Sequence, residues 1–199
     1  MILTRTPIIS GATPTFAPDG FQWRNLTEFA RLESGHTPSR KHPEWWGGTI
    51  PWLALPDIRR LHGKHAYETT EYINDAGLAN SSARLLPPGT VCVSRTASIG
   101  FVTILGRQMA TSQDFCDWIC DPKKLDPEFL MYAFMASQDY LRNLGSGAVH
   151  KTIYMPAIEA FSICAPDLPS QREIAASLKQ RLQAAEGVID NAEKLNTPS

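Results

Sequence analysis

The chain has 199 residues, 43% of them hydrophobic and 20% charged, which is enough for one full hydrophobic core and an appendage. No apolar run approaches the ~18 residues of a membrane helix, and the first residues do not open a signal peptide, so we expect a cytoplasmic protein without a membrane partner. A net charge of −1 argues against a simple nucleic-acid binder. The basic residues nevertheless concentrate in residues 1–110, where 11 Lys and Arg stand against 8 Asp and Glu.

The cysteines bear on the compartment and on metal binding. All four lie in apolar, strand-like surroundings: Cys92, Cys116, Cys120 and Cys164. Cys116 and Cys120 are separated by three residues, which is not the spacing of a zinc knuckle. The sequence therefore predicts buried reduced thiols, no metal site and a reducing compartment.

In chain order, residues 1–20 are rich in Thr, Pro, Gly, Ala and Ser and are predicted to be an N-terminal extension with the form of an extended arm. Residues 21–32 begin the body as a strand or short helix, and a short strand is predicted over 50–55. The polar stretch 62–83 is predicted to be loop-rich. Further strands are predicted over residues 90–94, 99–105 and 115–120.

A helix is predicted from Pro127 to about Asn143, because Asp126 stands at the N-cap position and proline is favoured in the first helical turn. A short helical segment near 155–160 and a strand over 161–164 complete the body. Strands and helices that mix without a βαβ rhythm indicate an α+β fold with a mixed sheet.

The last segment, residues 169–199, is predicted to be one long helix that follows a body at 21–168. Ser170 stands where an N-cap belongs and Glu173 follows three residues later, which is typical of a capping box. Apolar residues then recur at steps of three and four, as in a coiled coil. We call this set the apolar stripe: Ala175, Leu178, Leu182, Ala185, Ile189 and Ala192, with Asn196 in the seventh position. A helix of about 24 residues spans roughly 36 Å, so we expect another helix to cover the stripe.

Familiar catalytic motifs are missing from the sequence. It contains no Gly-x-x-x-x-Gly-Lys-Ser/Thr phosphate loop, no His-Glu-x-x-His pair and no Gly-x-Ser-x-Gly elbow. The five histidines lie in loop-like segments without a pair at helical spacing. A non-catalytic chain is therefore favoured, and the alternative is an interaction module or a hydrolase that uses Cys92 or a histidine.

Several short motifs follow one another between residues 21 and 195. They are Gly35-x-Thr37-Pro38-Ser39, Trp46-x-Gly48-x-Ile50-Pro51-Trp52 with Asp57, Gly77-Leu78 with Ser81-Ser82, Pro88-Gly89-Thr90-Val91, Ser94-x-Thr96-Ala97-Ser98-Ile99-Gly100, Ala110-Thr111-Ser112-Gln113, and Gly147 with Lys151 and Ile153 before Pro166-x-Leu168-Pro169-x-Gln171. In this order they resemble a DNA target-recognition domain of the specificity subunits of type I restriction–modification enzymes. Ser112 replaces the usual Asn. Typical members carry two such domains and two long helices, and this chain holds one of each.

The resemblance implies a role without catalytic activity of its own. Such subunits dock onto a DNA adenine methyltransferase, which binds S-adenosylmethionine, and a restriction and translocase subunit completes the complex. Each recognition domain reads one half of a split target in double-stranded DNA, and paired helices set the gap. With one domain and one helix, the chain is expected to form a homodimer or to pair with a second half-subunit. A fragment of a two-domain subunit, or the recognition domain of a fused restriction–methyltransferase, is the narrower alternative.

Contacts to DNA are expected from polar and basic loop residues, because Arg and Lys pair with guanine and Gln with adenine, each good pair discriminating by ~1–3 kcal/mol. The candidates are Ser39, Arg40, Lys41, Arg59, Arg60, Lys64, Arg95, Thr96, Gln113, His150 and Lys151. Arg40 and Lys41 also fit a solvated surface, and Arg59 and Arg60 also fit phosphate contacts. Gln113 also fits a brace of the fold. A structural wedge is expected from the tryptophans of the first loop and strand, Trp45, Trp46 and Trp52.

Overall fold

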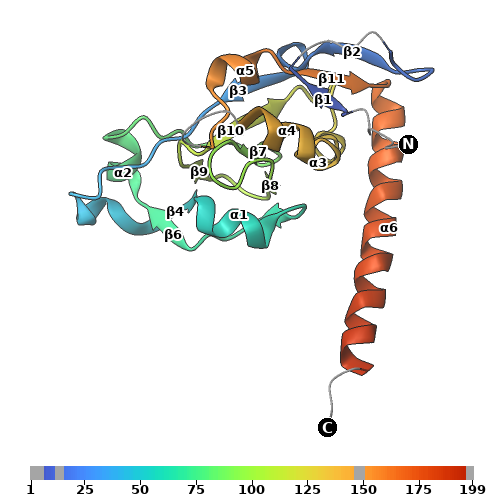
Figure 1. Cartoon of the computed structure of the whole chain (residues 1–199). Coiled ribbons are helices and arrows are strands. Elements are labelled where there is room, and N and C mark those ends of the chain that lie inside the picture. Colours follow the sequence, from blue (N-terminus) through green and yellow to red (C-terminus); the bar gives the residue numbers. More distant parts are fainter. Residues whose placement is uncertain (1–6, 12–15, 146–150, 196–199) are drawn as a thin grey trace.

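The computed structural model describes residues 7–11, 16–145 and 151–195, with side chains described up to residue 188. These residues form a body of three small sheets with short helices around them (Figure 1). One long helix, α6 (Leu168–Leu195), runs from the upper edge of the body down past it. Because two of the sheets contain both parallel and antiparallel pairs, the expected α+β class with mixed sheets is confirmed.

The central sheet carries most of the core. Its strand order is β3 (Ala30–Glu33), β10 (Phe115–Cys120), β7 (Val91–Ser94), β8 (Val102–Leu105) and β5 (His65–Ala66). All of β7 and β8 is buried, as expected for strands covered on both faces. The helix α3 (Pro127–Ala136) packs on one face, while α1 (Leu55–Leu61) and the end of β4 contribute to the cluster on the other. The strand predicted at 115–120 is confirmed, and the strands predicted at 90–94 and 99–105 are confirmed with later starts.

A second sheet joins segments that are far apart in the sequence. Its order is β1 (Ile9–Ser10), β11 (Ser162–Ala165) and β2 (Gln22–Asn25), and both pairings are antiparallel. Ile9 pairs with Ile163, and both side chains are fully buried. Part of the segment predicted to be an extended arm is therefore a strand of the body. The sheet also lies beside the start of α6 (Figure 1).

The third sheet has the order β6 (Glu71–Ile73), β4 (Trp46–Leu53) and β9 (Ala110–Thr111). The short helices η1 (Leu26–Glu28), η2 (Pro43–Trp45), α2 (Asp75–Ala79) and α5 (Met155–Glu159) complete the body. Two predictions are wrong here. Residues 62–83 contain β5, β6 and α2 rather than only loops, because Asn74 caps α2 by accepting from Gly77 N and the strands pair with distant partners. Leu55 begins α1 instead of ending a strand.

The helix predicted over 127–143 is broken in two. Asp126 caps α3 by accepting a hydrogen bond from Phe129 N at 3.0 Å, as expected. Ser137 then has φ −100° and ψ 9°, outside the helical region, and α4 (Gln138–Gly145) follows. The Ser137 hydroxyl accepts hydrogen bonds from the backbone N–H groups of Ile8 and Ile9, at 3.0 and 2.8 Å. The break thus ties the N-terminal strand to the helices, a contact that local periodicity does not reveal.

The helix α6 has two different parts. It begins at Leu168, and its cap is Asp167, which accepts a hydrogen bond from Ser170 N at 3.0 Å. The prediction of Ser170 as N-cap is therefore wrong. Asp167 precedes the helix, and its short carboxylate reaches the third helical N–H. Ala175 is buried against the body, whereas Leu178, Leu182 and Ala185 are exposed. Of the apolar stripe, Ile189 and Ala192 lie beyond the described side chains, and Asn196 lies outside the described residues.

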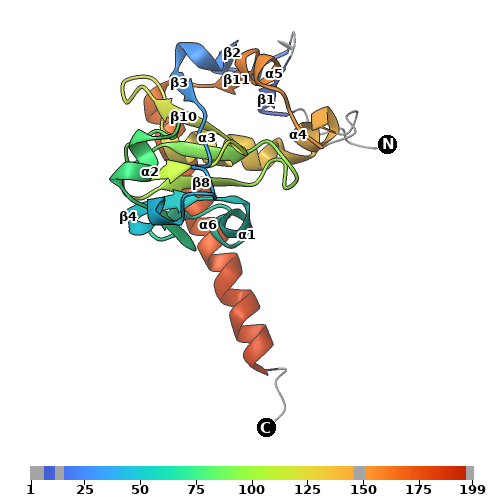
Figure 2. The same cartoon turned by 90° about the vertical axis from the view of Figure 1, so that its left-hand side faces the viewer.

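Twenty-eight helical residues span about 42 Å, and the lower turns of α6 extend past the body in both views (Figures 1 and 2). Exposed apolar side chains continue along it to Val188, which is 69% exposed. Among the described side chains, the body therefore covers Ala175 of the apolar stripe but leaves Leu178, Leu182 and Ala185 exposed.

Candidate nucleic-acid interface

The turn between β7 and β8 is the centre of the candidate interface. Ala97 adopts φ 51°, in the left-handed region that costs a non-glycine residue energy, and Gly100 follows with φ 82°. The Ser94 hydroxyl donates to Ser98 O, and Gly100 N donates to Ser94 O at 2.9 Å, which closes the turn. A strained turn held by its own hydrogen bonds presents its residues in one fixed arrangement.

Three of the predicted residues meet beside this turn. Arg95 donates from Nε to Gln113 O at 3.0 Å and from Nη1 to Ile153 O at 3.3 Å. The Thr96 hydroxyl donates to Asp114 at 2.6 Å, and Gln113 Oε1 accepts from the Thr37 hydroxyl at 2.6 Å. The side chains of Arg95 and Thr96 therefore brace neighbouring loops. The exposed Gln113 keeps its amide NH₂ without a partner among the described residues, so it can donate to an incoming group.

A cavity of about 580 Å³ opens next to the same turn. Arg59 of α1, Arg142 of α4 and Lys151 contribute basic side chains to it. Arg59 donates from Nε to the Ser98 hydroxyl at 3.4 Å. Two predicted residues, Arg59 and Lys151, thus lie together, and Arg142 is a neighbour that the sequence analysis missed. The signal was weak, because an arginine in an amphipathic helix usually marks only its solvated face.

Arg40 is engaged within the chain. It donates to both carboxylate oxygens of Glu71, with Nη2 to Oε2 at 2.8 Å, and its guanidinium lies 3.6 Å from the ring centroid of Trp46. The hydrogen bond to Glu71 raises the pKa of Arg40, and the same bond lowers the pKa of Glu71. Trp46 meets Trp52 edge-on, with ring centroids 5.0 Å apart. This arrangement holds the loop of residues 34–45 to β4 and β6, and it uses two of the five N–H donors of Arg40.

The remaining predicted residues are dispersed. Ser39 and Lys41 are exposed in the first loop, and Arg60 pairs with the buried Asp57 at 3.1 Å. Lys64 lines a separate cavity of about 360 Å³ together with residues of α6, away from the β7–β8 turn. His150 lies outside the described residues.

A buried carboxyl group stabilises the loop of residues 34–45. Asp117 on β10 is fully buried, and burial raises its pKa to about 7. It accepts a hydrogen bond from the Thr111 hydroxyl at 2.6 Å, and Thr111 O in turn accepts from His36 N at 3.0 Å. A side chain on Gly35 would collide with Thr111, since a Cβ there would lie 2.0 Å from Thr111 O. The sequence analysis missed this support, although an Asp between buried apolar residues was its signal.

The cysteines argue against the hydrolase alternative. Cys92, Cys116 and Cys164 are buried, and all four cysteines are free, as predicted. Burial raises the pKa of Cys92 well above its usual value, so it remains a thiol with no exposed surface. A nucleophile must be ionised and accessible. Cys92 is therefore a core residue.

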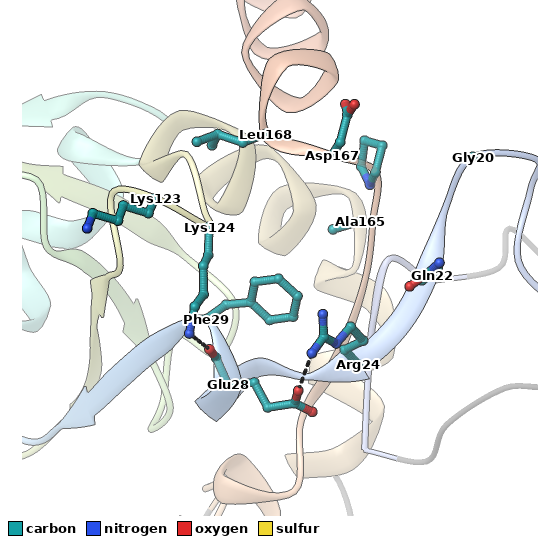
Figure 3. Close-up of a pocket in the computed structure, with 11 residues that line it drawn as sticks. Gly20, Gln22, Arg24, Glu28, Phe29, Lys123, Lys124, Ala165, Asp167 and Leu168 are labelled. Atoms are coloured by element: carbon teal, nitrogen blue, oxygen red, sulfur yellow. Dashed lines mark hydrogen bonds and ion pairs between the residues drawn. The ribbon is translucent and has the colours of Figure 1, made fainter.

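A cavity of about 690 Å³ lies where the body meets the start of α6 (Figure 3). Acidic Glu28 and Asp167 line it beside the basic residues. Arg24 pairs with Glu28 at 2.8 Å, and Lys124 pairs with Asp121 at 3.5 Å. No predicted DNA-contacting residue lines it. Its charge and its place at the junction distinguish it from the basic cavity beside the β7–β8 turn.

Two features are absent from the described part of the chain. Within it, no three His, Cys, Asp or Glu side chains are grouped so that they could hold a metal ion. Over the same residues, no helix is both long and apolar enough to cross a membrane.

Comparisons with known proteins agree with one another. Residues 18–191 match a family model described as the type I restriction modification DNA specificity domain. The chain is 26% identical over 182 residues to the type I restriction enzyme MjaIX specificity subunit of Methanocaldococcus jannaschii, which covers 90% of this chain and 41% of that protein. It is 27% identical over 133 residues to the HindI specificity subunit of Haemophilus influenzae, covering 65% of this chain and 28% of that one.

The fold is similar to that of two solved structures. The crystal structure of the HsdS subunit from Thermoanaerobacter tengcongensis matches with a TM-score of 0.70 at 18% identity, over 92% of this chain and 42% of that one. A chain from a structure of the type I R-M system, described in terms of complex assembly and conformational transition, matches with a TM-score of 0.72 at 19% identity, over 90% and 43%. The chain spans less than half the length of these relatives.

Proposed function

Because this chain belongs to the family of type I restriction modification DNA specificity domains, we propose that it is a sequence-reading part of a type I restriction–modification complex. It recognises one half of a split target in double-stranded DNA. A partner DNA adenine methyltransferase, with its own S-adenosylmethionine, performs the modification, and a restriction and translocase subunit cuts unmodified DNA. The chain acts in the cytoplasm and supplies specificity rather than catalysis.

One observation carries this proposal: the recognition body is joined to a long helix on which the apolar side chains of Leu178, Leu182 and Val188 are exposed. Leu178 and Leu182 are 36% and 43% exposed, and Val188 continues the exposed surface. Burying a fully exposed leucine contributes roughly 1.5–3 kcal/mol, so covering the exposed part of each of these two leucines would contribute about 1 kcal/mol to the binding of a partner helix. A second copy of this chain or a second half-subunit would supply that helix and the second recognition body.

The modest charge of the chain is compatible with DNA recognition in a complex. Phosphate neutralisation drives the affinity of most DNA-binding proteins, but only base contacts carry sequence information. If the methyltransferase holds the duplex, this chain needs few basic residues, placed near the bases. The exposed Gln113, whose backbone carbonyl accepts from Arg95 of the β7–β8 turn, and the basic cavity on the same turn are the candidates for contacts to DNA.

Single-molecule sequencing of methylated genomic DNA tests the proposal, with cells that contain or lack this chain and that contain the neighbouring methyltransferase in both cases. We expect a split adenine-methylation motif that disappears with the chain. A palindromic motif identifies a homodimer, and an asymmetric motif identifies a pair of different half-subunits. If the methylated motifs are identical with and without the chain, the proposed function is wrong.

A further inference from the structure

The cavity beside the β7–β8 turn is built from three separate segments of the chain. Arg59 comes from α1, Ala97 to Ile99 come from the turn, and Arg142 comes from α4; Lys151 completes the lining. Its volume of about 580 Å³ leaves room for a polar group together with bound water. Convergence of three segments on one cavity indicates that the fold, and not local sequence, creates it.

The charge of this cavity is unbalanced. Arg59, Arg142 and Lys151 line it, and no carboxylate does so. Elsewhere in the described residues most arginines pair with an acidic partner: Arg24, Arg31, Arg40, Arg60, Arg84 and Arg107. Arg59 and Lys151 have no ion pair among the described residues. Arg142 has only Asp139, at 3.6 Å, whose side chain is 97% exposed and therefore contributes little.

The positive charge beside the cavity also affects the pKa of a neighbouring histidine, His62. Burial lowers the pKa of His62, and the charge of Arg142 lowers it further. Val102 N donates to His62 Nδ1 at 3.1 Å, so that nitrogen acts as an acceptor. His62 packs edge-on against Phe101, which also lines the cavity. The side of the cavity next to α4 is thus electropositive at neutral pH.

Hydrogen bonds within the chain hold part of the cavity lining. The Ser98 hydroxyl orients Arg59 at 3.4 Å. Ala97 N donates to Lys151 O at 3.1 Å, so the strained turn also fixes the backbone of Lys151. Like charges that are held together without a counter-ion repel one another, and an anion that binds between them relieves this repulsion. Guanidinium and ammonium groups suit phosphate oxygens.

We propose that this cavity binds a phosphodiester group of the DNA backbone, with Arg59, Arg142 and Lys151 as the cationic contacts. The inference rests on the proposed function and adds a division of labour to it. The cavity positions the duplex without reading its sequence, and the exposed Gln113 contributes to base recognition. Donor-only groups can also pair with guanine O6 and N7, but three cations without a carboxylate among them suit the negative charge of a phosphate better than a neutral base edge.

Salt dependence of DNA binding tests this site, because each phosphate contact adds about 0.9 to the slope of log K against log salt. The full-length chain, alone and co-expressed with its methyltransferase, is titrated against a duplex with the methylated motif and a scrambled duplex. The variants are Lys151→Gln and Arg142→Gln. The matched control is Lys123→Gln, an exposed lysine of the other cavity. Thermal denaturation checks that each variant folds.

Each cavity variant is expected to weaken binding to both duplexes equally and to reduce the salt slope by about 1. Between 50 and 200 mM salt, such a variant loses about 3.5-fold less affinity than the unchanged chain does. The methylated motif stays the same. An unchanged slope in both cavity variants, or the same change in the control, overturns the phosphate site while the proposed function stands. If the unchanged chain binds neither duplex in either form, both the site and the proposed function are wrong.

Discussion

The body and the terminal helix differ in how completely their apolar side chains are buried and their polar groups are paired within the chain. In the body, strands of the central sheet are covered on both faces, and polar loop residues such as Arg95 and Thr96 find partners across the interface. The helix α6 is buried against the body at Gln171 and Ala175 and pairs with it through Lys179 and Glu128 at 2.8 Å, and it exposes apolar side chains from Leu178 to Val188. The comparison teaches that the body is a finished folding unit, whereas the helix is one half of an interface.

The largest effect is expected from charges on the exposed part of the helix. Leu178→Asp combined with Leu182→Asp places two carboxylates on the surface that a partner helix would cover, so pairing and target methylation should be lost. The body should remain folded, because both side chains are already exposed. Methylation in cells and thermal denaturation of the purified chain measure the two effects.

The control for that experiment is Ser177→Asp with Gln180→Asp, which puts the same charges at exposed positions beside the stripe. It should leave methylation intact. Equal loss of methylation in both double variants would mean that charge on the helix, and not a covered stripe, matters.

A second expected effect lies within the body and depends on pH. Burial raises the pKa of Asp117 from 3.8 to about 7, so the folded chain holds this proton more tightly than the unfolded chain does. Stability from this group is therefore present at low pH and is lost as the pH rises from about 4 to about 7. The loss is on the order of 4 kcal/mol.

Asp117→Asn removes that titration, because the amide stays neutral and its oxygen can still accept from Thr111. Chemical denaturation at pH 5 and pH 8 should show a smaller difference between the two pH values for the variant than for the unchanged chain. A difference of the same size in both proteins would show that Asp117 does not ionise in this range.

The smallest effect is expected from Arg40. Arg40→Ala removes the stacking on Trp46 and both hydrogen bonds to Glu71, and these half-exposed contacts contribute about 1–2 kcal/mol. Arg40→Lys keeps the charge but not the planar, two-pronged pairing, so its stability should fall between those of the other two proteins. Urea denaturation measures this order. If Arg40→Ala changes the methylated motif without changing stability, Arg40 reads DNA after all.

Several local features followed from the sequence alone. The strand at 115–120, the Asp126 cap and the buried free thiols were predicted. Each rests on a local signal: an apolar and aromatic run for the strand, a capping residue for the helix, and cysteines in apolar surroundings for the thiols. The α+β class and the family resemblance followed from the order of the elements and motifs. The uncovered stripe followed from helical periodicity, except at Ala175, which the body covers.

The tertiary structure alone decided the rest. Ser137 breaks a helix because it binds the backbone of residues 8 and 9, more than 120 positions away in the chain. The pairing of Arg40 with Glu71 and Trp46, and the place of Arg142 in one cavity with Arg59, could not be read from the sequence. The physical reason is common to these cases. Residue type determines what a side chain can bind, but the partners that it meets come from segments distant in sequence, and only the folded chain brings them together.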